Sequence, residues 1–364
     1  MQITGVTQHH LSHAADGAFY PTWIPEYPQG THEVELFEIE TDAGITGIAA
    51  SPSFGGGVQY ADAVAAFLNG EDPHDVRGIR RKLDSINLVG PSPWHLEIAL
   101  WDIIGKDAGK PVYELLGGTG DPVPVYASTG ELKPADERIA YVEERLEEGI
   151  EAIKLRVSTH DDVEVVRAVR EAFPEVTLMV DANKGWAVRV MAEEEPWDYR
   201  DALAFCRELE DIGGIAWLEE PLLRHDYDGY ARLRENTDVP IAGGEFNDGV
   251  FQFREFIERD ALDIYQPDAA LATGVLGAVE VASMARATGA EFVPHTWTNG
   301  VGFVANLHIL AAVESPWCEY PAEPPWSPEV RDFMLTEPLV HEDGHIAPPD
   351  GPGLGVELDE SVLE

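Results

Sequence analysis

The chain has 364 residues, of which 67 are acidic and 24 are basic, so its formal net charge is -43. This charge argues against nucleic acid and anionic membranes as partners, because both require basic patches. No apolar run approaches the roughly 20 residues of a membrane span, and the N-terminus lacks the pattern of a signal peptide. We therefore expect a cytoplasmic protein. A halophile's salt-loaded cytoplasm suits it best, because salt screens charge repulsion.

The first part of the chain does not alternate strand and helix. Alternating apolar and polar residues predict strands at 34–40 and 45–50, which form an antiparallel meander with the N-terminal strand. We predict an N-terminal α+β capping domain over residues 1–120. Helical periodicity follows the meander in three segments, 60–68, 76–86 and 95–104.

From residue 121 the pattern changes to alternating strand and helix. It predicts an α/β fold, a modified TIM barrel of the (β/α)7β type, over residues 121–322. The Pro- and Gly-rich segment 323–364 lacks this period, and we expect it to return to the cap and complete it. The predicted strands are 123–127, 152–157, 177–181, 215–219, 240–245, 263–268, 291–295 and 317–320.

Three predicted strands in succession end on a carboxylate: Asp181, Glu219 and Glu245. A single strand-end acid is more often a turn or helix-capping residue than a ligand. In a parallel barrel, however, all three converge on the C-terminal face, where they repel one another unless a cation neutralises them. Hard oxygen ligands suit Mg²⁺, and Mn²⁺ is the alternative that the sequence leaves open. Cys206 and Cys318, the only cysteines, predict neither a disulfide nor a metal site.

Other barrel strands also carry reactive groups. Strand two contains Lys154 and Arg156, which alternation places on one side of the strand. Strands six, seven and eight contribute Asp268, His295 and Glu319. A lysine within a buried strand is costly unless it has partners, which favours a functional role.

These pieces resemble the enolase superfamily, and most closely its mandelate racemase subgroup. The likeness covers nearly the whole chain in order, including the helix at 97–107 and the junction at 111–118. The matching strand-end motifs are Val180-Asp-Ala-Asn183, Trp217-Leu-Glu-Glu-Pro-Leu222, Gly243-Gly-Glu245, Gln266-Pro-Asp268 and Pro294-His295.

The resemblance implies roles for the site residues. The three carboxylates would bind one Mg²⁺ that chelates a substrate carboxylate, and Asn183 would help to hold substrate oxygens. His295 would be the general base, with Asp268 fixing its tautomer. Glu319 would hydrogen-bond the substrate carboxylate as charge develops. Removing a proton α to a carboxylate creates an enediolate, which requires a metal, a cation and an acidic hydrogen bond nearby.

One position departs from the subgroup's best-studied pattern. Mandelate racemase has a second lysine as the opposing base where this chain has Arg156, and arginine is a poor base. We therefore expect a sugar-acid dehydratase that forms a 2-keto-3-deoxy acid, with Lys154 and Arg156 as electrostatic clamps. A racemase or epimerase is the alternative. A non-catalytic scaffold protein is a third, but it predicts a lost ligand or base and none is missing.

Loops of the cap are expected to set specificity. The segment 20–29, which contains Tyr20 and Trp23, has the composition of a lid, and Ser51–Gly57 is a Gly-rich loop beside it. Trp297 follows the predicted base and could pack on the substrate's carbon chain. We expect a homo-oligomer acting on a small carboxylate.

Overall fold

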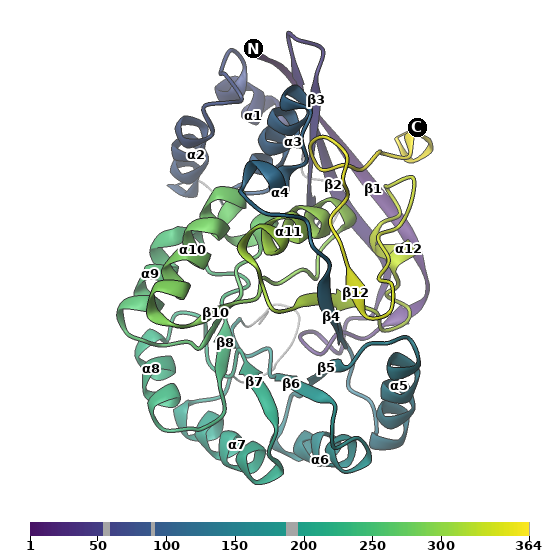
Figure 1. Ribbon diagram of the computed structural model, residues 1–364, viewed down its shortest axis with the longest axis vertical. Helices are drawn as coiled ribbons and strands as arrows, with labels where there is room; N and C mark the ends of the chain where they lie inside the picture. Colours follow the sequence, from purple (N-terminus) through teal and green to yellow (C-terminus); the bar gives the residue numbers. More distant parts are fainter. Residues whose placement is uncertain (54–58, 89–91, 187–195, 364) are drawn as a thin grey trace.

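A curled parallel sheet forms the larger part of the molecule, surrounded by helices (Figure 1). The computed structural model describes residues 1–53, 59–88, 92–186 and 196–363. The parallel strands are β4 (Val123–Ser128), β5 (Ala152–Arg156), β6 (Thr177–Asp181), β7 (Ile215–Glu219), β8 (Ile241–Gly243), β9 (Ile264–Tyr265), β10 (Glu291–Phe292) and β11 (Cys318–Pro321). They pair in chain order from β4 to β10, and β11 lies on the other side of β4. The predicted barrel topology is confirmed.

Each strand is joined to the next by a helix that covers the outside of the sheet. These helices are α5 (Ala135–Glu147), α6 (Val163–Ala172), α7 (Tyr199–Ile212), α8 (Tyr227–Glu235), α9 (Gly249–Glu258), α10 (Gly274–Thr288) and α11 (Gly300–Val313). Short helices η2 (His160–Asp162) and η3 (Ala269–Thr273) precede α6 and α10. A strand–helix alternation that ends on a strand is the (β/α)7β order predicted from the sequence.

Side chains close the barrel between its last two strands. No backbone ladder joins β10 to β11 within the ranges that the structure describes. Instead, the Ser315 hydroxyl donates to the Phe292 carbonyl at 2.9 Å, and the Thr296 hydroxyl donates to the Glu319 carbonyl at 2.6 Å. We call this junction the side-chain seam.

Three of the predicted strands are shorter than the sequence suggested. β8, β9 and β10 end before Glu245, Asp268 and His295, which lie in the turns that follow. Pro267 and Pro294 have no N–H group, so the ladders on β9 and β10 cannot continue through them. The carboxyl and imidazole groups therefore extend from loop backbone directly above the strand ends.

The cap is a three-stranded antiparallel meander covered by helices, as predicted. Its strands are β1 (Ile3–Phe19), β2 (Gln29–Thr41) and β3 (Thr46–Pro52). Its helices are α1 (Ala61–Leu68), α2 (Val76–Ser85), η1 (Ile86–Leu88), α3 (Leu96–Ala108) and α4 (Val112–Leu115). β2 is longer than predicted, and the hairpin that it forms with β1 reaches from the cap to the barrel (Figure 1).

The C-terminal tail links cap and barrel. It contains α12 (Pro328–Arg331), β12 (His345–Ile346) and η4 (Glu360–Val362), and β12 pairs antiparallel with β4. Farther on, Gly353 donates to the Lys110 carbonyl and accepts from Val112, while Leu354 N–H donates to Asp102 at 2.9 Å. The tail returns to the cap as predicted, whereas domain boundaries at residues 120 and 322 stay predictions.

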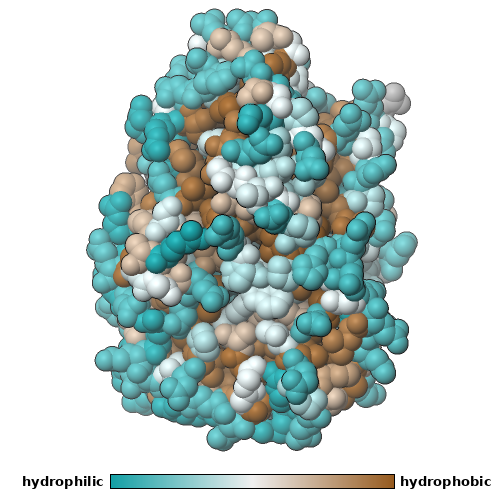
Figure 2. Space-filling view, viewed as in Figure 1, coloured by the Kyte–Doolittle hydropathy of each residue, from teal (hydrophilic) through white to brown (hydrophobic). Residues whose placement is uncertain are grey.

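The segment Ala269–Thr288 is long and apolar enough to cross a membrane by length and composition, which corrects the expectation that no such run exists. It comprises η3 and α10, and most of it is buried inside the molecule. Core helices pass the same test, so this is weak evidence for a span. Hydrophilic residues dominate the face shown in Figure 2. Cys206 and Cys318 are both buried and form no disulfide.

Candidate active site

The site lies one step above an apolar layer inside the barrel. Tyr126, Ala152, Met179, Trp217, Ala242, Ile264 and Val293 form a buried cluster with one residue from each of seven successive strand segments. Because side chains alternate along a strand, the residue two positions on points to the same interior. The residues two positions beyond the apolar cluster form the next interior layer: Ser128, Lys154, Asp181, Glu219, Gly244, Gln266 and His295.

Each of the three strand-end carboxylates has one oxygen held by an uncharged donor. The Asn183 N–H donates to Asp181 Oδ1 at 2.8 Å. Glu219 Oε2 accepts from the Trp217 indole at 3.0 Å and the Gln266 amide at 2.8 Å. The Trp186 indole donates to Glu245 Oε1 at 2.7 Å, so all three carboxylates are fixed in orientation.

The second oxygen of each carboxylate faces a cationic group. Lys154 Nζ lies 2.7 Å from Glu219 Oε1 and 3.4 Å from Asp181 Oδ2, and Arg156 also contacts Asp181 Oδ2. Glu245 Oε2 lies 3.4 Å from His295 Nε2.

The donor set fits a hard divalent cation, because three buried carboxylates each keep one oxygen for a positive charge and secure the other. As the side chains stand, no group of three His, Cys, Asp or Glu among the residues described is arranged to hold a metal. Lys154 and Arg156 lie among the second oxygens, so metal binding requires these two cations to shift.

The Lys154 ammonium is fully buried and has three acidic neighbours. In addition to Asp181 and Glu219, it contacts Glu319 Oε1 at 2.7 Å. Burial alone would lower the pKa of Lys154, but Glu219 and Glu319 hold that pKa above its usual range. The group therefore remains a cation.

Arg156 is held on several sides. Its guanidinium donates to the Thr129 carbonyl at 2.6 Å and to Asn183 Oδ1 at 2.9 Å, besides its contact with Asp181. It also lies over the rings of Trp23 and Trp297, 5.5 and 5.3 Å from their centroids. Despite burial, the carboxylates raise the pKa of Arg156, so it stays protonated.

His295 lies between two carboxylates. Its Nδ1 is 2.9 Å from Asp268 Oδ2, and its Nε2 faces Glu245. Burial acts to lower the pKa of His295, but Glu245, Glu319 and Asp268 together raise it to about 9. The metal-free imidazole therefore carries a proton on both nitrogens near neutral pH; Asp268 holds the one on Nδ1, so Nε2 is the atom that can release its proton and then act as a base.

The side-chain carboxylate of Glu319 is surrounded by hydrogen-bond donors. The Ser128 hydroxyl, the Thr296 N–H and Lys154 donate to it at 2.7 to 2.9 Å. Burial opposes its ionisation, but Lys154 and His295 hold the pKa of Glu319 well below its usual range. These contacts favour the ionised carboxylate, which cannot donate a hydrogen bond to a substrate.

An aromatic wall covers one side of the site, and we define it as Phe19, Trp23, Trp186, Trp297 and Trp326. Neighbouring ring centroids in this wall are 5.8 to 6.3 Å apart. The predicted lid contributes Trp23, because the Thr22 N–H and hydroxyl both bond to the Gly130 carbonyl after β4. The wall places flat apolar surfaces against the guanidinium of Arg156.

Two predicted specificity elements are not brought into this wall. The Tyr20 side chain is 51 % exposed, and only the Tyr20 N–H reaches the rim, where it donates to Glu131. The Gly-rich loop Ser51–Gly57 falls largely outside the described residues, because 54–57 belong to the gap. Trp23 and Trp297 contact each other in the wall, and their role in lining a substrate stays a prediction.

The sequence prediction did not include several residues that contact the predicted groups. Ser128 and Gln266 belong to the polar interior layer, where a count of two from Tyr126 and Ile264 would have found them, whereas Trp217 lies in the apolar layer below. Trp186 and Thr296 lie in loops, where no periodic signal identifies them.

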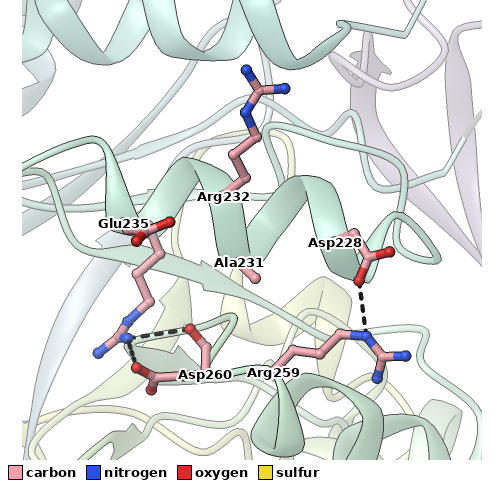
Figure 3. A pocket seen from close by; sticks show the side chains of 7 residues that line it. Asp228, Ala231, Arg232, Glu235, Arg259 and Asp260 are labelled. Carbon is pink, nitrogen blue, oxygen red and sulfur yellow. Dashed lines mark hydrogen bonds and ion pairs between the residues drawn. The ribbon is translucent and has the colours of Figure 1, made fainter.

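A separate hollow of about 600 Å³ lies on the outside of the barrel (Figure 3). Arg234 pairs with Asp260 and Asp263, and Arg259 pairs with Asp228. Because these arginines are neutralised locally and lie among helices away from the strand ends, the hollow supplies no alternative catalytic centre.

The metal-free protein should lose stability as the pH rises from about 6.5 to about 9. The pKa of His295 rises from 6.5 to about 9 on folding, and burial raises that of Asp181 from 3.8 to about 8. The folded state therefore retains protons that the unfolded chain has released, and each costs up to about 1.4 kcal/mol per pH unit. Thermal unfolding in EDTA across this window measures the slope. A stability that rises with pH would contradict the prediction.

Comparisons with known proteins agree with this fold. The family model "Mandelate racemase / muconate lactonizing enzyme, N-terminal domain" matches residues 19–117, and "Enolase C-terminal domain-like" matches residues 137–362. The D-galactarolactone cycloisomerase of Agrobacterium fabrum is 32 % identical and covers 100 % of this chain and 98 % of its own length. The arabinonate dehydratase of Saccharolobus solfataricus is 31 % identical over 94 % of this chain and 91 % of its own.

A solved structure shows the same fold with ligands present. The L-talarate dehydratase of Polaromonas sp. JS666, complexed with Mg and L-glucarate, superposes with a TM-score of 0.83. It is 28 % identical, and the match covers 99 % of this chain and 96 % of that one.

Proposed function

Because the chain belongs to the mandelate racemase and muconate lactonizing enzyme family of the enolase superfamily, we propose that it is a Mg²⁺-dependent sugar-acid dehydratase. Its substrate is an aldonate or aldarate, and its product is the 2-keto-3-deoxy acid. The observation that carries this proposal is the constellation of His295, Asp268 and three oriented carboxylates around a buried lysine. The relatives named dehydratases and the neighbour with Mg and glucarate support it.

Asp181, Glu219 and Glu245 would hold the metal through the oxygens that now face cations. A bound Mg²⁺ would supply positive charge to the substrate carboxylate and so lower the cost of the enediolate. Mn²⁺ has similar oxygen preferences and is a second candidate. The uncharged donors on the other oxygens keep the carboxylates aligned before and after binding.

His295 is the proposed acid and base. Asp268 holds the proton on Nδ1, so Nε2 takes the proton from the carbon α to the substrate carboxylate. The same Nε2–H then gives this proton to the β-hydroxyl, which leaves as water as the α–β double bond forms. The resulting enol tautomerises to the 2-keto acid, and His295 returns to its starting state.

Lys154 and Arg156 are the proposed clamps for the developing negative charge. Their raised pKa values keep both side chains protonated, so neither acts as a base. We propose that Asn183 and the aromatic wall, through Trp23 and Trp297, position the substrate, with Tyr20 at the rim. The contacts of Glu319 support a role as the anchor of Lys154 rather than as a hydrogen-bond donor to substrate.

Two other reactions use the same first step. Racemisation or epimerisation needs a second base on the opposite face, and neither strand-two cation offers one. Cycloisomerisation of a lactone is favoured by the relative that carries this name. An ester oxygen on the β-carbon leaves without needing a proton, so this reaction requires only the base.

A screen of sugar acids and their lactones with Mg²⁺ in concentrated KCl tests the proposal. Semicarbazide detects the 2-keto-3-deoxy product, and EDTA should abolish its formation because the enediolate charge is then unbalanced. Product from open-chain acids supports dehydration, whereas product from lactones alone supports cycloisomerisation. Label from D₂O in recovered substrate of both configurations, without keto acid, would refute both in favour of racemisation.

We also propose a setting and an assembly state. The net charge of -43 supports a salt-rich cytoplasm as in a halophile, since the Debye length falls to about 3 Å at 1 M salt. An unfolding temperature that does not rise with KCl would contradict this. We further propose domains at 1–120, 121–322 and 323–364, a homo-oligomer, and small carboxylates rather than nucleic acid or membranes as partners.

A further inference from the structure

A polar cluster of the cap contacts the barrel behind the site, and we name it the cap clamp: Arg80 on α2, Trp94, and Glu97 on α3. Arg80 Nη1 donates to Glu97 Oε2 at 2.8 Å, and the Arg80 guanidinium lies 4.7 Å from the centre of the Trp94 ring. Glu97 is fully buried and Arg80 nearly so. The pair joins two cap helices, and both of its members also bond to the barrel.

The clamp binds both ends of the junction between η3 and α10. Arg80 Nη1 donates to the Thr273 carbonyl at the end of η3, and Glu97 Oε1 accepts from the Leu276 N–H at 2.6 Å. Glycines permit this approach: a Cβ on Gly274 would lie 2.1 Å from Glu97 Oε2, and one on Gly277 would lie 2.3 Å from Arg80 Nη2.

The other end of η3 is capped by Asp268, the residue that orients the proposed base. Asp268 Oδ1 accepts from the Ala270 and Leu271 N–H groups at 2.7 and 3.3 Å, while its Oδ2 contacts His295 Nδ1. The helix is a single π-turn of five residues, a form often found at functional sites. Its position therefore decides where Asp268 points.

The clamp also holds the loop after β8. The Trp94 indole donates to Asp248 Oδ1, three residues beyond Glu245. Glu245 Oε2 faces His295 Nε2 at 3.4 Å, so the clamp reaches the loop on one side of the imidazole and the π-turn on the other.

We propose that the cap clamp is a positioning device for His295. It fixes η3 and the loop after β8 from behind, and thereby sets the two carboxylates that flank the imidazole. Arg80, Trp94 and Glu97 act through Asp268 and Glu245 and touch no reacting atom. The inference rests on the proposed function only in taking His295 as the base.

The test compares the double variant Arg80→Met/Glu97→Gln with Arg77→Met. The double variant removes the clamp without leaving a buried charge unpaired. Arg77 lies on the same helix and pairs with Glu280 of α10 at 3.4 Å, but this exposed ion pair does not touch η3. Trp94→Phe is a milder variant that loses the bond to Asp248 but keeps an aromatic ring beside Arg80, and it serves if the double variant does not fold.

We expect kcat of the double variant to fall about tenfold or more with KM within about twofold of wild type, because misplacement near 1 Å can cost about 10²-fold. The downfield proton resonance of His295 Nδ1–H, assigned by its loss in His295→Asn, should shift. Trp94→Phe should show smaller changes in the same direction, and Arg77→Met should match wild type.

Unchanged kcat and resonance in folded clamp variants would overturn the proposal. Equal losses in the clamp variants and Arg77→Met would also overturn it, because they indicate only cap–barrel adhesion. If no substrate is found for wild type, the proposed function fails. The shift of the His295 Nδ1–H resonance in the clamp variants still tests the clamp, because it needs no substrate.

Discussion

Replacing His295 by asparagine should reduce turnover by about 10²- to 10⁴-fold, the range for loss of a positioned general base. Asparagine retains an amide that can donate to Asp268, but it has no basic lone pair to receive the α-proton. In the proposed mechanism the metal, the two strand-two cations and the aromatic wall bind the substrate, so KM should change little. The semicarbazide assay at saturating substrate measures the effect.

The fold and the metal site of this variant serve as its controls. Mg²⁺ should still raise its unfolding temperature, because the three carboxylates are intact. Exchange of the substrate's α-proton in D₂O should fall with turnover, since both reactions begin with the same proton transfer. Full exchange with lost turnover would show that His295 acts only as the acid, and full turnover would exclude it from catalysis.

Replacing Lys154 by methionine should have the largest effect on stability. Its ammonium neutralises Asp181, Glu219 and Glu319 inside the barrel. Breaking a buried ion pair costs about 3–5 kcal/mol, a large part of a typical total of about 5–15 kcal/mol. We expect denaturant unfolding in EDTA to show a loss of this size, and turnover with Mg²⁺ to fall about 10²-fold or more.

Mg²⁺ should stabilise this variant more than it stabilises wild type. The missing ammonium no longer lies beside the carboxylate oxygens, and the extra negative charge favours a cation. Lys106→Met is the matched control, because Lys106 lies 2.7 Å from the buried Asp102 in the cap. It should also lose stability, but its response to Mg²⁺ should equal that of wild type. Equal responses in both variants would show that Lys154 does not border the metal site.

Much of the barrel could be predicted because its signals are local. Apolar strands alternate with amphipathic helices, and each of the eight predicted strand segments overlaps an observed strand. Their lengths were less predictable, since Pro267 and Pro294 end two ladders within apolar runs. Pairing across the side-chain seam depends on Ser315 and Thr296, and no periodicity marks such residues.

The residues of the site were predictable where a strand places them and less so elsewhere. Alternation on β5 correctly put Lys154 and Arg156 on one side, and their shared contact with Asp181 follows from it. Loop residues such as Trp186 depend on tertiary packing. The sequence alone could not predict that the Glu319 carboxylate acts as a hydrogen-bond acceptor, because its donors come from β4, β5 and the loop before α11.

The site is complete only after the barrel has closed at the side-chain seam. β11 is the last barrel strand to be synthesised, and it carries Glu319 to Lys154 across 165 residues of chain. A chain that has assembled only β4 to β10 lacks Glu319 at the site, so the buried Lys154 ammonium is short of one counter-charge. We therefore expect nascent and partly opened molecules to be inactive, and amide hydrogen exchange at β11 to follow loss of activity during unfolding.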